Sequence, residues 1–152
     1  MMTRIDFYHL QKVTVEQALP RLLEKAYTTG KNVLVKIGNE DRVEFLNTVL
    51  WTYDDQSFLP HGSKKDGNAD RQPIWLTAGD DNPNASKMLF LVDGAKVDIE
   101  KLTNFDRVFN MFDGSSEESL FQARELWKHI KSLGLECFYW RQDNNGCWQQ
   151  KA

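Results

Sequence analysis

Two short, almost continuous apolar runs constrain the fold more than any other feature of this sequence. Residues 32–37 read Asn-Val-Leu-Val-Lys-Ile and end at Gly38, and residues 88–92 read Met-Leu-Phe-Leu-Val and end at Asp93-Gly94. Runs of this length and composition are typical of strands that are buried on both faces of a parallel sheet. They predict an α/β fold in which helices cover both sides of the sheet.

Helix signals lie between the predicted strands. Thr14 and Gln17 form a capping-box signature, and apolar residues at helical spacing lead from there to Gly30, which predicts the end of the helix. Pro20 lies one turn inside this segment and lacks an N–H donor, so we expect the helix to bend there or to begin later. Asn39 is suited to cap a second helix.

The strongest helix pattern covers residues 116–133 and ends at Gly134. Six apolar residues are predicted to share one arc of this helix: Leu120, Ala123, Leu126, Trp127, Ile130 and Leu133. Further strands are predicted at residues 4–8, 74–77, 105–112 and 135–140, and residues 141–152 form a polar tail. The alternation predicts one domain, residues 1–152, folded as a three-layer α/β sandwich around a mostly parallel or mixed twisted sheet.

The composition argues against several classes of protein. The chain has a net charge of -3, with 41% apolar and 27% charged residues, which is typical of a soluble globular domain and weakens the case for direct DNA binding. It shows no secretory signal and no apolar run of membrane-spanning length, so we expect neither export nor insertion in a membrane. Cys137 and Cys147 have no second pair beside them, which favours reduced thiols in the cytoplasm.

The motifs of nucleotide enzymes are incomplete. Gly30-Lys31 resembles the end of a Walker A loop, but Lys25 stands where the first glycine belongs and Asn32 replaces the magnesium-binding Ser or Thr. Residues 88–93 resemble a Walker B strand ending in Asp93. Without a phosphate loop, we interpret Asp93 as part of a turn after a strand, and we expect no cofactor.

Metal binding and acid–base catalysis have little support in the sequence. His9, His61 and His129 lack the spacing of metal ligands, so no metal site is predicted. The acidic pairs at residues 54–55 and 80–81 lie in polar loops, where solvated turn carboxylates are more common than catalytic dyads. We therefore predict no catalytic residues.

The helix at residues 116–133 carries a cationic stripe beside its apolar arc. Arg124, Lys128 and Lys131 are three to four positions apart, so their charged groups can converge on one anion, while Trp127 and Phe121 flank them. This chemistry suits a peptide that ends in an aromatic residue and a free carboxylate. A solvated helix face with lysines near its end is the simpler interpretation, and the residues alone favour it.

A second candidate surface combines Trp51 with Phe58, Leu59 and Pro60. An aromatic residue near the end of a helix, together with an apolar segment in a polar region, predicts an exposed patch for a protein partner. The same residues fit a small cluster tucked under the sheet equally well.

Several segments, in this order and spacing, resemble the chi subunit family of bacterial DNA polymerase III. They are Phe7-Tyr8, residues 30–35, Leu50-Trp51, residues 57–61, residues 73–76, residues 89–94, residues 105–109, residues 123–128 and Gly134. The resemblance implies a non-enzymatic accessory subunit of the clamp-loader assembly in DNA replication. It also implies a nucleotide-binding-like fold without a nucleotide site.

The resemblance also implies partners. Family members bind the acidic, Phe-ending C-terminal tail of single-stranded DNA-binding protein, and Arg124, Trp127 and Lys128 match the tail-binding positions, with Phe112 as an apolar neighbour. Some relatives carry a further basic residue one turn earlier, where this sequence has Leu120 or Phe121.

The second surface has its own implied partners. Trp51, Phe58, Leu59 and Pro60 resemble the family's surface for the psi subunit, which links chi to the clamp loader. A helicase-like repair protein is the other candidate for this surface.

Two other functions compete with this interpretation. A direct single-stranded nucleic-acid-binding protein would use Trp and Phe side chains as stacking platforms, although the negative net charge argues against it. A degenerate nucleotide-binding enzyme would use Asp93, although phosphate ligands are missing from the sequence.

Overall fold

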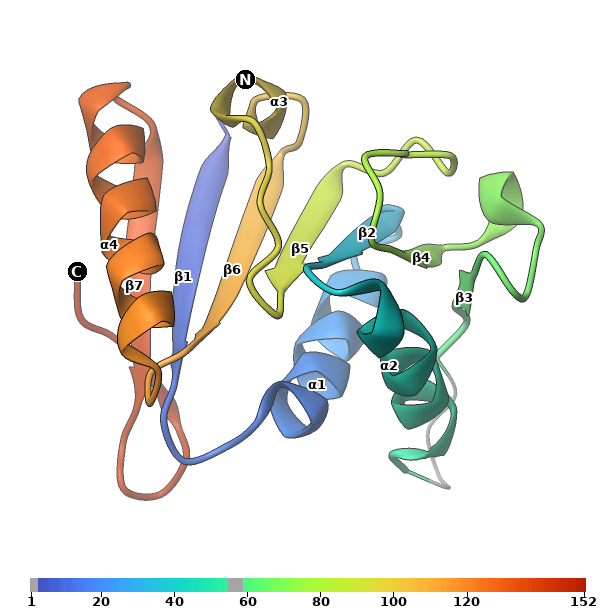
Figure 1. The fold of residues 1–152 in the computed structure, drawn as a ribbon, viewed down its shortest axis with the longest axis horizontal. Coiled ribbons are helices and arrows are strands. Elements are labelled where there is room, and N and C mark those ends of the chain that lie inside the picture. Colours follow the sequence, from blue (N-terminus) through green and yellow to red (C-terminus); the bar gives the residue numbers. More distant parts are fainter. Residues whose placement is uncertain (1–2, 55–58) are drawn as a thin grey trace.

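The computed structural model describes residues 3–54 and 59–152, and this part of the chain forms an eight-stranded sheet with helices on both faces (Figure 1). The strands are β1 (Arg4–Leu10), β2 (Val33–Ile37), β3 (Gly62–Ser63), β4 (Ile74–Thr77), β5 (Met88–Val92), β6 (Arg107–Asp113), β7 (Glu136–Gln142) and β8 (Trp148–Gln150). Their order in the sheet is β3-β4-β2-β5-β6-β1-β7-β8. Neighbouring strands are parallel, except that β7 and β8 are antiparallel.

The helices divide between the two faces of the sheet. They are α1 (Val15–Tyr27), α2 (Glu40–Thr52), α3 (Ile99–Leu102) and α4 (Glu117–Ser132), with a 3-10 turn at Ala69–Arg71. Apolar residues of α1 and α2 share one buried cluster with the sheet, and those of α3 and α4 share the other. The predicted three-layer α/β sandwich is therefore confirmed.

Side chains that alternate between the two faces of the central strands form the two cores. In β2, Val33, Val35 and Ile37 pack toward α1 and α2, whereas Leu34 packs toward α3 and α4. All five residues of β2 are buried, as are all five of β5, because both strands have covered neighbours on each side. The two apolar runs of the sequence thus form the interior of the sheet, as predicted.

The first strand connects the two ends of the chain. β1 pairs with β6 and β7, so residues at the N-terminus contact residues more than a hundred positions away. Asp6 of β1 is fully buried and accepts hydrogen bonds from Arg4, from Arg107 Nη2 at 2.9 Å and from Trp140 Nε1 at 2.9 Å. A buried carboxylate needs such partners, and these link β1 to β6 and β7 through side chains as well as the backbone.

The first helix begins where the capping residues predict and not later. The backbone N–H of Thr14 donates to Gln17 Oε1 at 3.0 Å, and α1 continues through Pro20 to Tyr27. The alternative of a later start is therefore wrong. A proline inside a helix removes one backbone hydrogen bond. Pro20 is buried, so packing of its apolar ring in the core offsets part of this cost.

Near the C-terminus, the structure departs from the sequence prediction. Leu133 follows the last residue of α4, Ser132, and is 52% exposed, so it does not belong to the apolar arc. Residues 141–152, predicted as a polar tail, include the end of β7 and the strand β8. The ring centroid of Trp148 lies 5.0 Å from that of Tyr8, which packs β8 against the core.

The one-turn helix α3 was also missed by the sequence prediction, because four residues show no measurable periodicity.

We expect Gly38→Ala to destabilise the fold by about 1–3 kcal/mol, the usual cost of overpacking. A Cβ atom at Gly38 would lie 2.1 Å from Asp93 O and 2.8 Å from Ala95 N, and backbone atoms cannot move aside as a flexible side chain can. Urea unfolding followed by circular dichroism measures the effect. Gly134→Asn is the control, because Gly134 has open space around it and Asn tolerates its positive φ. Equal losses in the two variants would contradict the clash.

Candidate functional site

A pocket of about 330 Å³ lies between α4 and the strands β1, β6 and β7. Its lining is Phe7, Phe112, Leu120, Ala123, Arg124, Trp127, Lys128, Tyr139 and Ala152. Four of these residues were predicted as a binding site from sequence: Phe112, Arg124, Trp127 and Lys128. The structure therefore brings them together around one concave site, although they come from two elements.

Aromatic rings form the wall of this pocket. The ring centroid of Trp127 lies 5.3 Å from that of Phe7 and 6.1 Å from that of Tyr139, in both cases edge to face. Phe112 lies behind them, with its centroid 6.1 Å from Tyr139. These contacts leave the rings little freedom, so the pocket is formed before any ligand arrives, and it suits a single large apolar side chain.

Two cations stand on the exposed side of the pocket. Arg124 and Lys128 are one helical turn apart on α4, and both are exposed. Among the described residues, Arg124 forms no ion pair, and Lys128 has only an exposed pair with Glu125 at 3.5 Å. Such exposed pairs contribute little, so both cations are available for an anionic ligand group beside the apolar pocket.

A buried histidine supports the aromatic wall from behind. His9 Nδ1 hydrogen-bonds with the hydroxyl of Tyr139, and the His9 ring centroid lies 5.1 Å from that of Phe112. Burial, followed by the nearby charges of Arg141 and Arg124, lowers the pKa of His9 below its usual value. Burial also raises the pKa of Tyr139, so both groups are uncharged at neutral pH.

The remaining predicted residues of this helix lie elsewhere. Phe121 is 63% exposed and lines a different, larger cleft. Lys131 Nζ lies 5.3 Å from the ring centroid of Trp127, outside the set of residues that line the pocket. Sequence reasoning missed Phe7 and Tyr139 as site residues. Their only signal was strand alternation, which does not show that β1 and β7 lie side by side.

The second predicted surface is partly exposed and partly buried. Trp51 is 48% exposed near the end of α2, and its ring centroid lies 4.2 Å from that of the buried His61. Leu59 is 2% exposed and belongs to the core beneath α2, while Pro60 is half-buried. Phe58 lies outside the described residues. Thus Trp51 presents an aromatic surface, whereas Leu59 belongs to the core.

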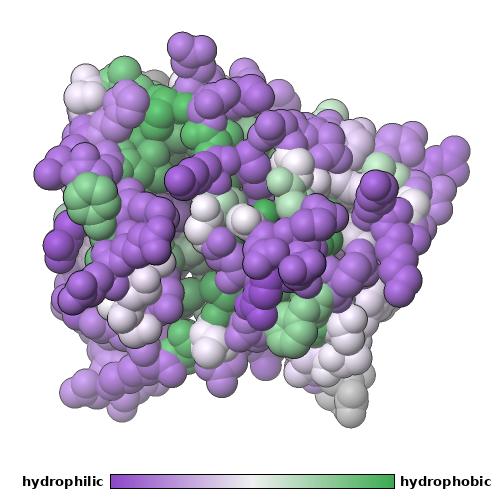
Figure 2. All heavy atoms as spheres, viewed as in Figure 1, coloured by the Kyte–Doolittle hydropathy of each residue, from purple (hydrophilic) through white to green (hydrophobic). Residues whose placement is uncertain are grey.

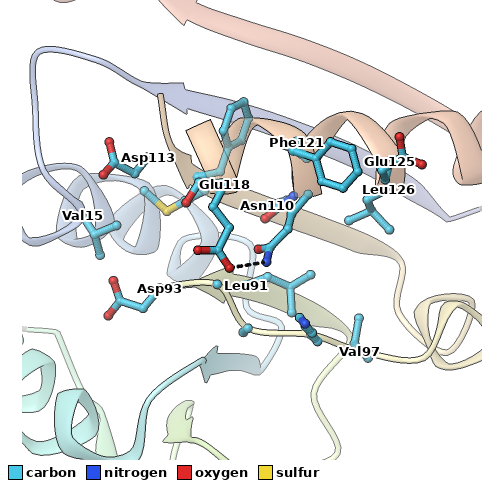
Figure 3. A pocket seen from close by; sticks show the side chains of 18 of the residues that line it. Val15, Leu91, Asp93, Val97, Asn110, Asp113, Glu118, Phe121, Glu125 and Leu126 are labelled. Carbon is cyan, nitrogen blue, oxygen red and sulfur yellow. Dashed lines mark hydrogen bonds between the residues drawn. The ribbon is translucent and has the colours of Figure 1, made fainter. Parts of the chain in front are cut away.

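The larger cleft has a volume of about 1230 Å³ and lies at the carboxyl ends of β5 and β6 (Figure 3). Open α/β sheets bind nucleotides at such an edge. Here Asp93 follows β5 with a φ of 53° and accepts a hydrogen bond from Arg42 Nε at 2.9 Å, as a turn residue would. Asp113, Glu118 and Glu125 also line the cleft, together with Arg42, Lys96 and Lys128, so the charges of its lining are mixed.

The part of the chain that the structure describes offers neither a metal site nor a membrane-spanning helix. Within residues 3–54 and 59–152, no group of three His, Cys, Asp or Glu side chains is placed to hold a metal ion. Cys137 is buried and Cys147 is exposed, and both are free thiols. In the same part of the chain, none of the helices has the length and apolar character needed to cross a bilayer.

The fold and the pocket define a three-layer α/β domain that carries an aromatic and cationic pocket beside its last helix. A family model described as the DNA polymerase III chi subunit matches residues 2–137, and the chain belongs to this family. A probable DNA polymerase III subunit chi of Rickettsia prowazekii is 32% identical over 132 residues, which cover 87% of this chain and 76% of the relative. A DNA polymerase III subunit chi of Pseudomonas aeruginosa is 30% identical over 92 residues, which cover 58% of this chain and 63% of the relative.

We expect the protein to lose stability as the pH falls from about 7.5 to about 5.5, in part because of His9. Its pKa is lower in the folded state than in the unfolded state. The folded state therefore binds fewer protons, and the contribution of neutral His9 is lost as the pH falls below about 6.5. In His9→Gln, urea midpoints at the two pH values should differ less than in the wild type.

His129→Gln is the matched control, because His129 is exposed on α4. This variant should keep the pH dependence of the wild type. If His9→Gln also keeps it, buried His9 is not the titrating group.

Proposed function

We propose that this protein is a non-catalytic accessory subunit of the DNA polymerase III holoenzyme in DNA replication. Its pocket beside α4 binds the acidic C-terminal tail of single-stranded DNA-binding protein. In this role it acts in the bacterial cytoplasm and reaches DNA indirectly, through the protein that coats the template. The family supports the replication role, and the observation that carries tail binding is the pairing of Arg124 and Lys128 with an aromatic pocket.

The chemistry of the tail fits the two parts of the site. Its terminal Phe enters the pocket bounded by Phe7, Phe112 and Trp127, where aromatic edges surround an apolar side chain. Its carboxylates pair with Arg124 and Lys128 in solvent, so the affinity falls as salt is added. A short disordered tail loses freedom on binding, so we expect a dissociation constant of about 1 μM or weaker.

The second face connects the protein to the rest of the holoenzyme. We assign Trp51, together with Leu59, Pro60 and Phe58, to binding of the psi subunit, which links this subunit to the clamp loader. The support is the ring of Trp51, which is 48% exposed where it packs on the buried His61. A helicase-like repair protein is the alternative occupant of the same surface.

Arg124→Glu should weaken binding of the tail peptide at least tenfold, because it replaces a cation beside the pocket with a repelling charge. A labelled peptide copying the C-terminus of the same organism's single-stranded DNA-binding protein is titrated at low and moderate salt, with fluorescence anisotropy as the readout. Lys25→Glu makes the same change in charge on α1, away from the pocket, and should bind like the wild type.

Two outcomes would contradict tail binding. One is equal loss of affinity in Arg124→Glu and Lys25→Glu, which would indicate only a general charge effect. The other is no binding of the peptide together with saturable binding of bare single-stranded DNA. That result would favour the direct nucleic-acid binder instead.

Trp51→Ala should reduce co-elution with a reconstituted psi and clamp-loader complex while leaving tail-peptide affinity unchanged. An exposed aromatic ring contributes to an interface mainly when a partner covers it, so the fold itself should tolerate the change. Phe45→Ala is the control, because Phe45 is 49% exposed on the same helix. Wild-type co-elution of Trp51→Ala would rule out this surface.

A further inference from the structure

Tyr139 lines the pocket beside α4, but neither the sequence nor the proposed function gives it a role. It lies on β7 directly across from Phe7 of β1, and both side chains face α4. Phe7 and Phe112 are only 1% and 7% exposed, whereas Trp127 and Tyr139 are half-buried. The ring surface that a ligand can contact in this pocket therefore belongs mainly to Trp127 and Tyr139.

The surroundings of the pocket make this ring surface distinctive. The face of the molecule that carries α4 is mostly hydrophilic in the space-filling view (Figure 2). A pocket walled by aromatic rings on such a molecule is a place where an apolar side chain of a ligand can leave water.

A buried histidine holds the side chain of Tyr139. His9 Nδ1 hydrogen-bonds with the Tyr139 hydroxyl, and the two ring centroids lie 5.8 Å apart, edge to face. Within the described residues His9 Nε2 has no hydrogen-bond partner, so the bond to Tyr139 is the one that this buried ring makes. Gly114 leaves room for the imidazole, since a Cβ atom there would lie 2.0 Å from His9 Nε2. The Tyr139 ring cannot turn away from the pocket without breaking a buried hydrogen bond.

The backbone of Tyr139 is fixed as well. Its carbonyl oxygen accepts a hydrogen bond from the N–H of Lys151 at 2.7 Å, and its own N–H donates to the carbonyl oxygen of Ala152 at 3.3 Å. On its other side, β7 pairs with β1. The ring of Tyr139 therefore has little freedom to lose when a ligand binds, which favours recognition by shape.

We propose that Tyr139, positioned by His9, is a specificity-determining residue of this pocket and selects an aromatic over an aliphatic side chain at the end of the bound peptide. The inference rests on the proposed function, because its ligand is the same tail peptide. The rings of Tyr139 and Trp127 stand at 84° to one another, so a phenyl ring between them meets one edge and one face. Aromatic pairs in such geometry gain energy beyond the burial of apolar area, whereas a leucine side chain gains only the burial.

A ratio of two affinities tests this inference. Two labelled peptides copy the C-terminus of the same organism's single-stranded DNA-binding protein, one ending in Phe and the other in Leu, and each is titrated by fluorescence anisotropy. The selectivity ratio is the dissociation constant of the Leu peptide divided by that of the Phe peptide. We expect a ratio of about five or more in the wild type, and a fall of about threefold in Tyr139→Leu, which keeps an apolar wall but loses the ring. Tyr139→Met should give the same fall, so the result does not depend on one variant.

Two variants of His9 test its positioning role. His9→Leu removes the nitrogen that bonds the Tyr139 hydroxyl, so the selectivity ratio should fall. His9→Asn places a side-chain amide close to the position of Nδ1, so it should restore part of the ratio. A histidine that only supports the fold would lower the urea midpoints of both variants and leave their ratios at the wild-type value, and that result would overturn positioning by His9.

Tyr27→Leu is the matched control, because Tyr27 is exposed at the end of α1 and does not line the pocket. It should keep the wild-type ratio. An unchanged ratio in Tyr139→Leu and Tyr139→Met, or equal binding of the two peptides by the wild type, would overturn the inference while tail binding stands. Failure of the wild type to bind either peptide would contradict the proposed function, and the inference with it.

Discussion

Parallel pairing of β1 with β6 on one side and β7 on the other is the constraint on which the rest of the structure depends. It carries Phe7 to the pocket and His9 behind Tyr139, and it places Asp6 among Arg4, Arg107 and Trp140. Side chains on opposite faces of one strand thus serve the core and the site at once. A change in the register of β1 by one residue would exchange these faces and remove both.

The last helix lines two surfaces, and Lys128 lines both of them. Arg124 and Lys128 face the aromatic pocket, while Glu118 and Glu125 face the cleft at the carboxyl ends of β5 and β6. One helical turn rises about 5.4 Å, which is less than the screening length of about 8 Å at physiological salt, so the fields of the two surfaces overlap.

Local patterns predicted the elements well and the long-range contacts poorly. The strands Val33–Ile37 and Met88–Val92 and the start of α4 follow from apolar runs and capping residues alone. Helical spacing also placed Arg124 beside Lys128. It did not separate Phe121 from them, because a helical wheel does not show which strands a helix packs against. β8 is polar in sequence, and only its pairing with β7 and the contact of Trp148 make it a strand.

Insertion of β1 between two late strands has a consequence for protein synthesis. β1 is synthesised long before its partner β7, which begins at Glu136, so the edge of β1 that pairs with β7 stays unpaired until that strand has emerged from the ribosome. Such non-local pairing slows folding and exposes an apolar strand in the meantime. The aromatic pocket therefore forms only after β7, which supplies Tyr139, has been made, and chains that terminate before β7 cannot compete for its ligand.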